Sequence, residues 1–129
     1  MLVVDDSASL RAMITRALSQ FGDIEVVGEC SDGVQATVTA VAVQPDVVLM
    51  DLHMPNLSGL EATKALAEQQ PAAKVITWTA APVTSAGLAD AVAAGAVGYQ
   101  TKTGDLLGLA GAVRTVASGG TAWLNDANM

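Results

Sequence analysis

The chain has 129 residues, 51% hydrophobic and 15% charged, a composition typical of a single ordered domain with a substantial core. Acidic residues outnumber basic ones by 13 to 6, and Lys and Arg form no cluster, which argues against direct binding of nucleic acid. The single cysteine, Cys30, excludes an internal disulfide and a thiolate metal site. No stretch resembles a membrane span or a signal peptide, and a cytoplasmic setting is expected.

The first half of the chain predicts three strands and two helices. A short strand over 2–5 precedes a helix over 9–21, whose inward face repeats at helical spacing. That face comprises Leu10, Met13, Ile14, Ala17, Leu18 and Phe21. A strand over 24–30 follows and ends at Cys30, which we expect to be a partly buried thiol. Asp32 then caps a helix that ends before Pro45, and a continuous apolar strand covers 46–50. The inward face of this second helix is expected to contain Val34, Val38, Val41 and Ala42.

The second half continues the alternation. Ser58 and Glu61 form a capping-box pair that opens a helix running to about residue 69. A strand over 74–79, an alanine-rich helix over 84–94, a strand over 97–100 and a helix over 105–118 follow. The last helix should bury Leu106, Leu109, Ala110 and Val113, and residues 121–129 should fold back through Trp123 and Leu124. Strict alternation predicts a doubly wound (βα)5 α/β fold with a parallel five-stranded sheet.

Polar residues stand at the ends of four of these strands. Asp5 and Asp6 follow the first strand, Asp51 the third, Thr79 closes the fourth, and Lys102 follows the fifth. The carboxyl ends of parallel strands share one edge of the sheet, where ligands of open α/β sheets bind. We therefore expect three carboxylates, a hydroxyl and an ammonium group to meet there. Trp78, as an alternate strand residue, is expected to point away from this site, with its N–H satisfied in the core.

These groups suit chemistry at a phosphoryl group. Three neighbouring anions destabilise one another, and Mg²⁺ suits a site of few carboxylates, waters and a phosphate. The backbone carbonyl of His53 can complete the metal shell, whereas its imidazole is expected to be solvated. Asp51 can attack phosphorus to form an acyl phosphate. Lys102 and Thr79 can then bind two oxygens of the transferred group.

The chain resembles the receiver domain of two-component response regulators over essentially its whole length. The motifs that carry the resemblance are Leu2-Val3-Val4-Asp5-Asp6-Ser7, Asp51-Leu52-His53-Met54-Pro55 with Gly59, Thr79-Ala80, and Gly98-Tyr99 before Lys102. The resemblance implies a flavodoxin-like fold with strand order 2-1-3-4-5. It also implies phosphorylation of Asp51 by a histidine kinase, Mg²⁺ held by Asp5 and Asp6, and no enzymatic activity beyond the protein's own phosphorylation and dephosphorylation.

The resemblance further implies a switch and an output. Thr79 and Tyr99 would form the switch pair, changing the surface around the fourth helix, fifth strand and fifth helix. The stretch 112–120 resembles regulators that continue into a helix-turn-helix domain, so DNA would be bound only through an output domain absent from this chain. We expect residues 1–120 to form the receiver and 121–129 a tail or the start of a linker. The chain is expected to be the front half of a longer regulator, with a stand-alone receiver as the alternative.

The sequence argues against two enzyme or cofactor-binding classes and leaves one binding class open. A flavodoxin-like mononucleotide binder needs a phosphate loop after the first strand, where this chain carries Asp5 and Asp6. An aspartate-based phosphohydrolase typically has a second Asp where His53 stands. Both are rejected. A phosphorylation-independent docking or dimerisation module on the same fold stays open, as does a homodimer through helical surfaces.

Overall fold

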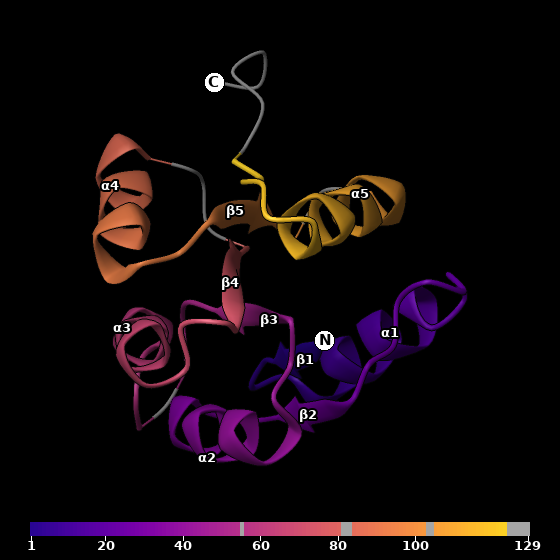
Figure 1. Ribbon diagram of the computed structural model, residues 1–129, viewed down its shortest axis with the longest axis horizontal. Coiled ribbons are helices and arrows are strands. Elements are labelled where there is room, and N and C mark those ends of the chain that lie inside the picture. The colour runs from indigo at the N-terminus through magenta and orange to yellow at the C-terminus, as the bar shows by residue number, and fades with distance from the viewer. Residues whose placement is uncertain (55, 81–83, 103–104, 124–129) are drawn as a thin grey trace.

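The computed structural model describes residues 1–54, 56–80, 84–102 and 105–123. Strands and helices alternate in the order β1 (Leu2–Val4), α1 (Ala8–Leu18), β2 (Gly28–Cys30), α2 (Gly33–Val43), β3 (Val47–Asp51), α3 (Gly59–Gln69), β4 (Lys74–Thr79), α4 (Ser85–Ala94), β5 (Gly98–Thr101) and α5 (Leu106–Ala117). All strands are parallel and form one sheet in the order β2-β1-β3-β4-β5 (Figure 1). The predicted doubly wound fold and its strand order are confirmed.

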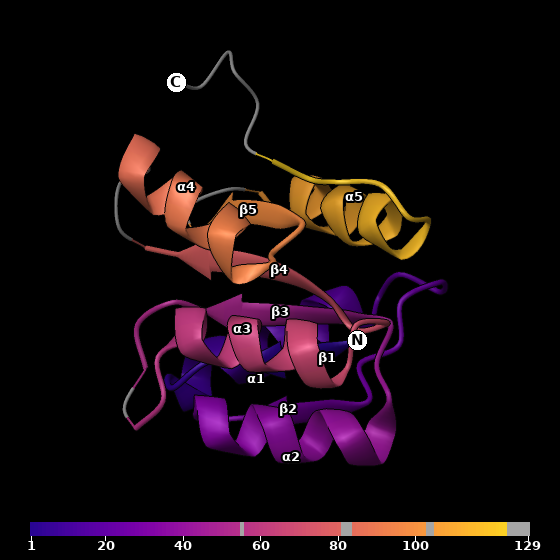
Figure 2. The same cartoon turned by 60° about the vertical axis from the view of Figure 1, so that its left-hand side comes forward.

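Helices cover both faces of the sheet. α1 and α5 lie on one face, and α2, α3 and α4 lie on the other (Figures 1 and 2). Alternate residues of β1 and β3 therefore enter two different cores: Val3 and Leu49 face α1 and α5, while Val4 and Met50 face α2 and α3. Burial on both faces explains why these strands read as uninterrupted apolar runs.

The strand register brings the polar residues to one edge. Val4 pairs with Met50, so Asp5 and Asp51 follow at neighbouring positions. Asp51 in turn pairs with Trp78, and Thr79 pairs with Thr101, the residue before Lys102. The carboxyl edge of the sheet thus presents the polar residues from four strands, as the sequence predicted.

The first helix and the second strand are shorter than predicted. α1 ends at Leu18, not Phe21, and β2 covers only the last part of 24–30. Between them the chain makes successive turns, in which Phe21 N–H donates to Leu18 O and Ile24 N–H donates to Phe21 O. These turns place Phe21 and Ile24 against the core beneath α1 and α5, so their apolar character is used for packing and not for helix or strand.

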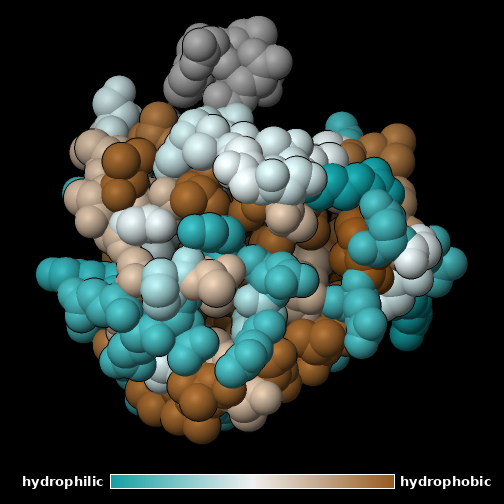
Figure 3. Space-filling model, viewed as in Figure 1, coloured by the Kyte–Doolittle hydropathy of each residue, from teal (hydrophilic) through white to brown (hydrophobic). Residues whose placement is uncertain are grey.

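Helix α2 is oriented opposite to the prediction. Its buried residues are Gly33, Ala36 and Ala40, whereas Val34, Val38 and Val41 are 51%, 66% and 54% exposed, and Ala42 is also exposed. Small side chains let the helix pack closely on the sheet and on α3. Eight of the eleven residues of α2 are glycine, alanine or valine, so polarity was a weak guide to which face lies inward. Brown surface over α2 in Figure 3 shows the resulting apolar face.

Other burial predictions divide between right and wrong. Met50 is buried in its apolar strand, and Leu109, Ala110 and Val113 of α5 are in the core as predicted. Cys30, expected to be partly buried, is only 2% exposed. Met13 is 54% exposed on α1, and Leu106 is exposed at the start of α5, so both predictions of burial are wrong. Both residues fit the apolar spacing of their helices, but their side chains face solvent.

The segment after α5 returns to the sheet. Ala122 O accepts from Tyr99 N–H at 3.1 Å, and Ala122 N–H donates to Val97 O at 2.9 Å, which covers part of the edge strand β5. Trp123 packs against a small cluster of Ala91, Ala96 and Tyr99. The predicted return of the chain is confirmed for Trp123, and Leu124 lies outside the described residues.

A pair of substitutions tests the orientation of α2. Val38→Ala should change the free energy of unfolding by no more than about 0.5 kcal/mol, because an exposed side chain is shortened in a helix. Ala40→Val should destabilise the domain by about 1–3 kcal/mol, because the added methyl groups overpack a buried contact. Urea unfolding of both variants measures the difference. A larger loss for Val38→Ala than for Ala40→Val would contradict the orientation.

Helix α4 should be the most mobile helix of the unphosphorylated protein. It buries only Ala91 and Ala94, Leu88 is half-buried, and Val92 is 53% exposed. Little apolar area therefore holds the helix in place. Hydrogen exchange followed by mass spectrometry should show its amides exchanging first among the five helices. Uniform protection of all five would contradict this expectation.

Candidate functional site

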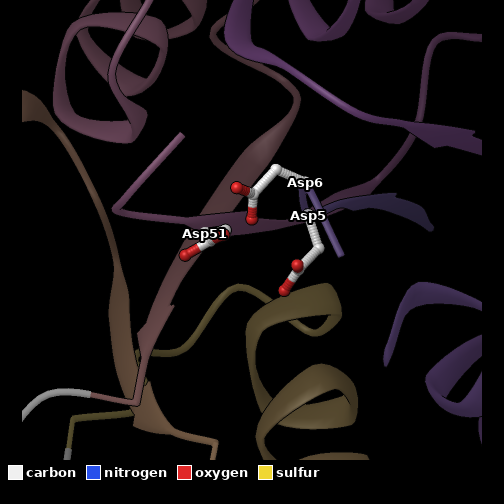
Figure 4. A group of neighbouring side chains, drawn as sticks. All are labelled: Asp5, Asp6 and Asp51. Atoms are coloured by element: carbon white, nitrogen blue, oxygen red, sulfur yellow. The ribbon is translucent and has the colours of Figure 1, made fainter. Parts of the chain in front are cut away.

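Three aspartates lie together at the carboxyl edge of the sheet. Asp5 and Asp6 follow β1 and Asp51 ends β3 (Figure 4), and one carboxylate oxygen from each lies within 4.8 Å of the other two. Asp5 and Asp51 are buried, whereas Asp6 is exposed. The cluster therefore has two carboxylates inside the protein and one at its opening to solvent.

Lys102 places its ammonium group between the two buried carboxylates. Its Nζ lies 2.8 Å from Asp5 Oδ2 and 3.2 Å from Asp51 Oδ1. The backbone N–H of Lys102 donates to Thr79 O at 2.8 Å, which fixes the start of the loop after β5. With all groups ionised, three carboxylates and one ammonium leave a formal charge of −2 on the site. A divalent cation would balance that charge.

Burial and neighbouring charges shift the pKa values at the site. Burial is the main cause that raises the pKa of Asp51, and the charge of Asp5 adds to it. The N–H of His53, which donates to Asp51 Oδ1 at 3.2 Å, and the ammonium of Lys102 act in the opposite direction. Burial alone would lower the pKa of Lys102, but the hydrogen bond to Asp5 and the charges of Asp51 and Asp5 outweigh it, and that pKa is raised. Lys102 therefore stays cationic.

The loop carrying Asp51 is packed against the start of α3 at a glycine. A Cβ built on Gly59 would lie 2.0 Å from Asp51 O and 2.7 Å from Leu52 Cα. Only a residue without a side chain allows this approach. Gly59 N–H donates to Leu52 O at 3.3 Å, and Ser58, paired with Glu61 as predicted, caps the helix beside it. Gly59 thereby holds the end of β3 and its aspartate in place.

Arg11, which the sequence did not indicate, holds the loop after β1 in place. Asp5 Oδ1 accepts from Ser7 N–H at 2.8 Å, and Ser7 is also the N-cap of α1. Arg11 Nη1 donates to Asp5 O at 2.6 Å, while its Nε lies 3.3 Å from Glu29 Oε1 on β2. Nothing in the spacing of Arg11 signals this role, because the contact depends on how the loop folds over the helix.

Trp78 contacts the site through Lys102, which the sequence did not predict. Lys102 Nζ lies 5.1 Å from the centroid of its ring, within the range of a cation–π contact. Its Nε1 is buried and has no hydrogen-bond partner among the described residues. The expectation that Trp78 is a core aromatic is confirmed, because it is 2% exposed and belongs to the core cluster that contains Leu109 and Ala110 of α5. The expectation that its N–H is satisfied is wrong. Strand alternation gave the direction of the side chain but did not show that Lys102 would reach over its ring.

The remaining predicted residues lie around this cluster. Thr79 is buried at the end of β4. Tyr99 is buried with Ala91 and Ala96 beneath α4, and burial raises the pKa of its phenol. His53 is exposed, as expected for its imidazole, and its backbone contacts Asp51. The structure thus brings together the aspartates, Lys102 and Thr79, whereas Tyr99 lies in a separate cluster on β5.

The acidic residues fit a hard divalent cation. Their donors are carboxylate oxygens, which Mg²⁺ prefers, and they come from a small number of side chains that leave room for water. Asp51 Oδ2 is buried without a hydrogen-bond partner among the residues described, a costly arrangement that a cation or a bound group would relieve. Asp5, Asp6 and Asp51 are therefore the residues that would hold the metal.

Residues 1–114 match the family model described as the response regulator receiver domain. The chain belongs to this family. The receiver is 40% identical over 121 residues to the response regulator GacA of Pseudomonas viridiflava, and 36% identical over 118 residues to the transcriptional regulatory protein LiaR of Bacillus subtilis. Each match covers 92% of this chain but only 55% and 56% of the relative, so the receiver spans about half the length of these proteins.

Solved structures share the same fold. A two-component response regulator of the LuxR family from Aurantimonas superimposes with a TM-score of 0.89 at 32% identity, covering 94% of this chain and 86% of that one. The signal receiver domain of the putative response regulator NarL from Mycobacterium tuberculosis gives 0.87 at 32% identity, covering 92% and 94%. Among the described residues, none of the receiver's helices is both long and apolar enough to cross a membrane.

Mg²⁺ should stabilise the receiver. A free concentration one hundred times the dissociation constant should raise the free energy of unfolding by about 2.7 kcal/mol, because the ion binds only the folded acidic cluster. Chelation with EDTA should reverse the effect. Asp6→Asn should reduce it, and a tenfold loss of affinity would remove about 1.3 kcal/mol at the same Mg²⁺ concentration.

Asp90→Asn, a change at an exposed site on α4, is the matched control and should keep the full effect. Urea unfolding with and without Mg²⁺ measures all three proteins. Equal stabilisation of the Asp6 and Asp90 variants would place the ion elsewhere.

Proposed function

We propose that the receiver takes a phosphoryl group from a histidine kinase onto Asp51. The observation that carries this proposal is the state of the Asp51 carboxylate. Oδ1 is held by Lys102 and by the N–H of His53, while Oδ2 is buried without a hydrogen-bond partner among the described residues. Oδ1 is thus oriented by two donors, and Oδ2 keeps its capacity to bind a cation or a transferred group unused.

The reaction proposed is a displacement at phosphorus. A carboxylate oxygen of Asp51 forms the new O–P bond, and the P–N bond to the donor's histidine breaks, leaving the imidazole with the bonding electrons. Lys102, already 3.2 Å from Asp51, would pair with an oxygen of the transferred group. The hydroxyl of Thr79, from the adjacent strand end, would donate to another. Mg²⁺, held by Asp5, Asp6, Asp51 and the carbonyl of His53, would supply neutralisation of the phosphoryl charge.

The proposed output passes through Thr79 and Tyr99. Movement of the Thr79 hydroxyl toward the phosphoryl group would leave space at β4 that the aromatic ring of Tyr99 fills. Two contacts support a link from Tyr99 to the surface. A Cβ on Gly87 would lie 3.4 Å from the Tyr99 hydroxyl, so the first turn of α4 rests near it, and the backbone N–H of Tyr99 donates to Ala122 O. The surface of α4, β5 and α5 is therefore the proposed readout.

The output domain is proposed to act in transcription. The support is the name of one relative: LiaR is a transcriptional regulatory protein, while GacA is named as a response regulator. A protein-glutamate methylesterase/protein-glutamine glutaminase of Thermotoga maritima also matches, at 37% identity over 101 residues, covering 78% of this chain and 29% of that protein. Sequences similar to this receiver therefore occur in proteins with different functions. We propose that residues 1–120 form the receiver and that 121–129 lead toward the output domain. DNA would be contacted only by that output domain. The proposed site of action is the cytoplasm, as is typical of the family.

A second candidate is docking or dimerisation without phosphorylation. The observation that favours it is the exposed apolar face of α2 formed by Val34, Val38 and Val41. Such a face could bury area against another molecule without any change at Asp51. The two candidates differ in whether the acidic site has to react.

Intact mass after incubation with acetyl phosphate and Mg²⁺ tests the first candidate. The receiver should gain one phosphoryl group, and the gain should be lost on chelation of the metal. Asp51→Asn, which keeps the shape of the side chain, should gain none, because an amide cannot attack phosphorus. No gain in a folded protein that binds Mg²⁺ would favour the docking module instead.

A further inference from the structure

Trp78 is the third contact of the Lys102 ammonium group. Two of the partners of Nζ are the carboxylates of Asp5 and Asp51, at 2.8 and 3.2 Å, and Nζ also lies over the ring of Trp78, 5.1 Å from its centroid. The side chain of Lys102 is only 14% exposed, so the ammonium is held among these groups and not by bulk water.

The tryptophan is rigidly placed. It lies on β4 between two other strands, paired with Asp51 on one side and Gln100 on the other, and its carbonyl accepts from Leu52 N–H at 3.2 Å. Its side chain is 2% exposed and packs with Leu109 and Ala110 of α5. The face that it turns to Lys102 is therefore fixed before any ligand arrives.

An aromatic face attracts a cation without competing with a phosphoryl oxygen for its N–H donors. The negative face of the indole draws the ammonium electrostatically, yet it accepts no conventional hydrogen bond and carries no net charge. A third carboxylate there would hold Lys102 away from a phosphoryl oxygen, and an aliphatic side chain would offer no attraction. The ring thus restrains the ammonium while leaving its N–H donors to oxygen atoms.

Filling the core does not explain the choice of tryptophan. Its Nε1 is buried and unpartnered among the described residues, a cost that phenylalanine or leucine at this position would avoid. Tryptophan offers in return the largest and most electron-rich face among the aromatic side chains. The contact with Lys102 is the feature of the structure that uses this face.

We propose that Trp78 is a positioning residue for Lys102, holding the ammonium beside Asp51 so that it meets the phosphoryl group with little rearrangement. The inference rests on the proposed roles of Asp51 and Lys102. It assigns Trp78 an effect on phosphoryl transfer that acts through the lysine and not through stability.

Rates of phosphorylation by acetyl phosphate at saturating Mg²⁺ test the effect. Trp78→Leu should lower the rate constant about fivefold, and Trp78→Phe, which keeps a smaller aromatic face, about twofold. In a Lys102→Met background the Trp78→Leu change should add no further loss, since the cation that it serves is gone. An equal loss in both backgrounds, or no loss in either, would overturn the proposal.

Phe21→Leu is the matched control. Arg114 lies over the ring of Phe21 at the same 5.1 Å, at the opposite end of the sheet, so this variant removes a core aromatic and a cation–π contact away from the site. It should destabilise the fold without changing the rate constant. A comparable rate loss for Phe21→Leu would assign the effect of Trp78 to stability and contradict the proposal.

Fluorescence reads the contact independently of phosphorylation. The chain has two tryptophans, so Trp123→Phe leaves Trp78 as the sole emitter. Lys102→Met should change its emission, and beryllofluoride with Mg²⁺ should change it only when Lys102 is present. An emission indifferent to Lys102→Met would overturn the positioning role, whereas a wild-type protein that gains no phosphoryl group would overturn the proposed function instead. The two failures are therefore distinguishable.

Discussion

The ion pairs of Lys102 with Asp5 and Asp51 are the interaction on which the site depends. Two carboxylates are buried within reach of each other, and without a nearby cation their repulsion and desolvation would be severe. A single ammonium offsets part of this cost and leaves the site negative. That residual charge is what makes the cluster suited to a divalent cation and then to a phosphoryl group. The ammonium therefore offsets enough charge for the domain to fold, and it leaves enough negative charge to bind a divalent cation.

The sheet and its connections hold the buried carboxylates in position. β1 and β3 are buried on both faces, and the apolar contacts of Leu2, Val48 and Leu49 hold their carboxyl ends at a fixed spacing. Gly59 brings α3 against the end of β3, and Arg11 ties the end of β1 to α1 and β2. Rigid strands with short loops therefore position the carboxylates, while α4, with few large buried side chains, is left free to respond.

Much of this could be predicted from the sequence, because parallel topology follows from alternation and places strand ends together. Asp5, Asp51, Thr79 and Lys102 were found in that way. The inward face of α2 could not be predicted, since alanine and valine are both apolar and the closeness of packing decides between them. The contacts of Arg11 and Trp78 depend on where long side chains reach in three dimensions, which residue spacing does not encode. The family resemblance supplied the role of Tyr99, and the structure adds its backbone hydrogen bond to Ala122.

Locating the reactive aspartate tests the central claim most directly. Borohydride reduction of the protein treated with acetyl phosphate and Mg²⁺ converts an acyl phosphate to homoserine, and trypsin then separates residues 1–11, with Asp5 and Asp6, from residues 17–64, with Asp51. We expect homoserine at Asp51 alone, because both carboxylate oxygens of Asp5 are engaged, Oδ1 by Ser7 N–H and Oδ2 by Lys102, whereas Asp51 Oδ2 has no hydrogen-bond partner among the described residues. Homoserine in the 1–11 peptide would show that the acid pair after β1 reacts, and would contradict the assignment of Asp51 as the phosphoryl acceptor.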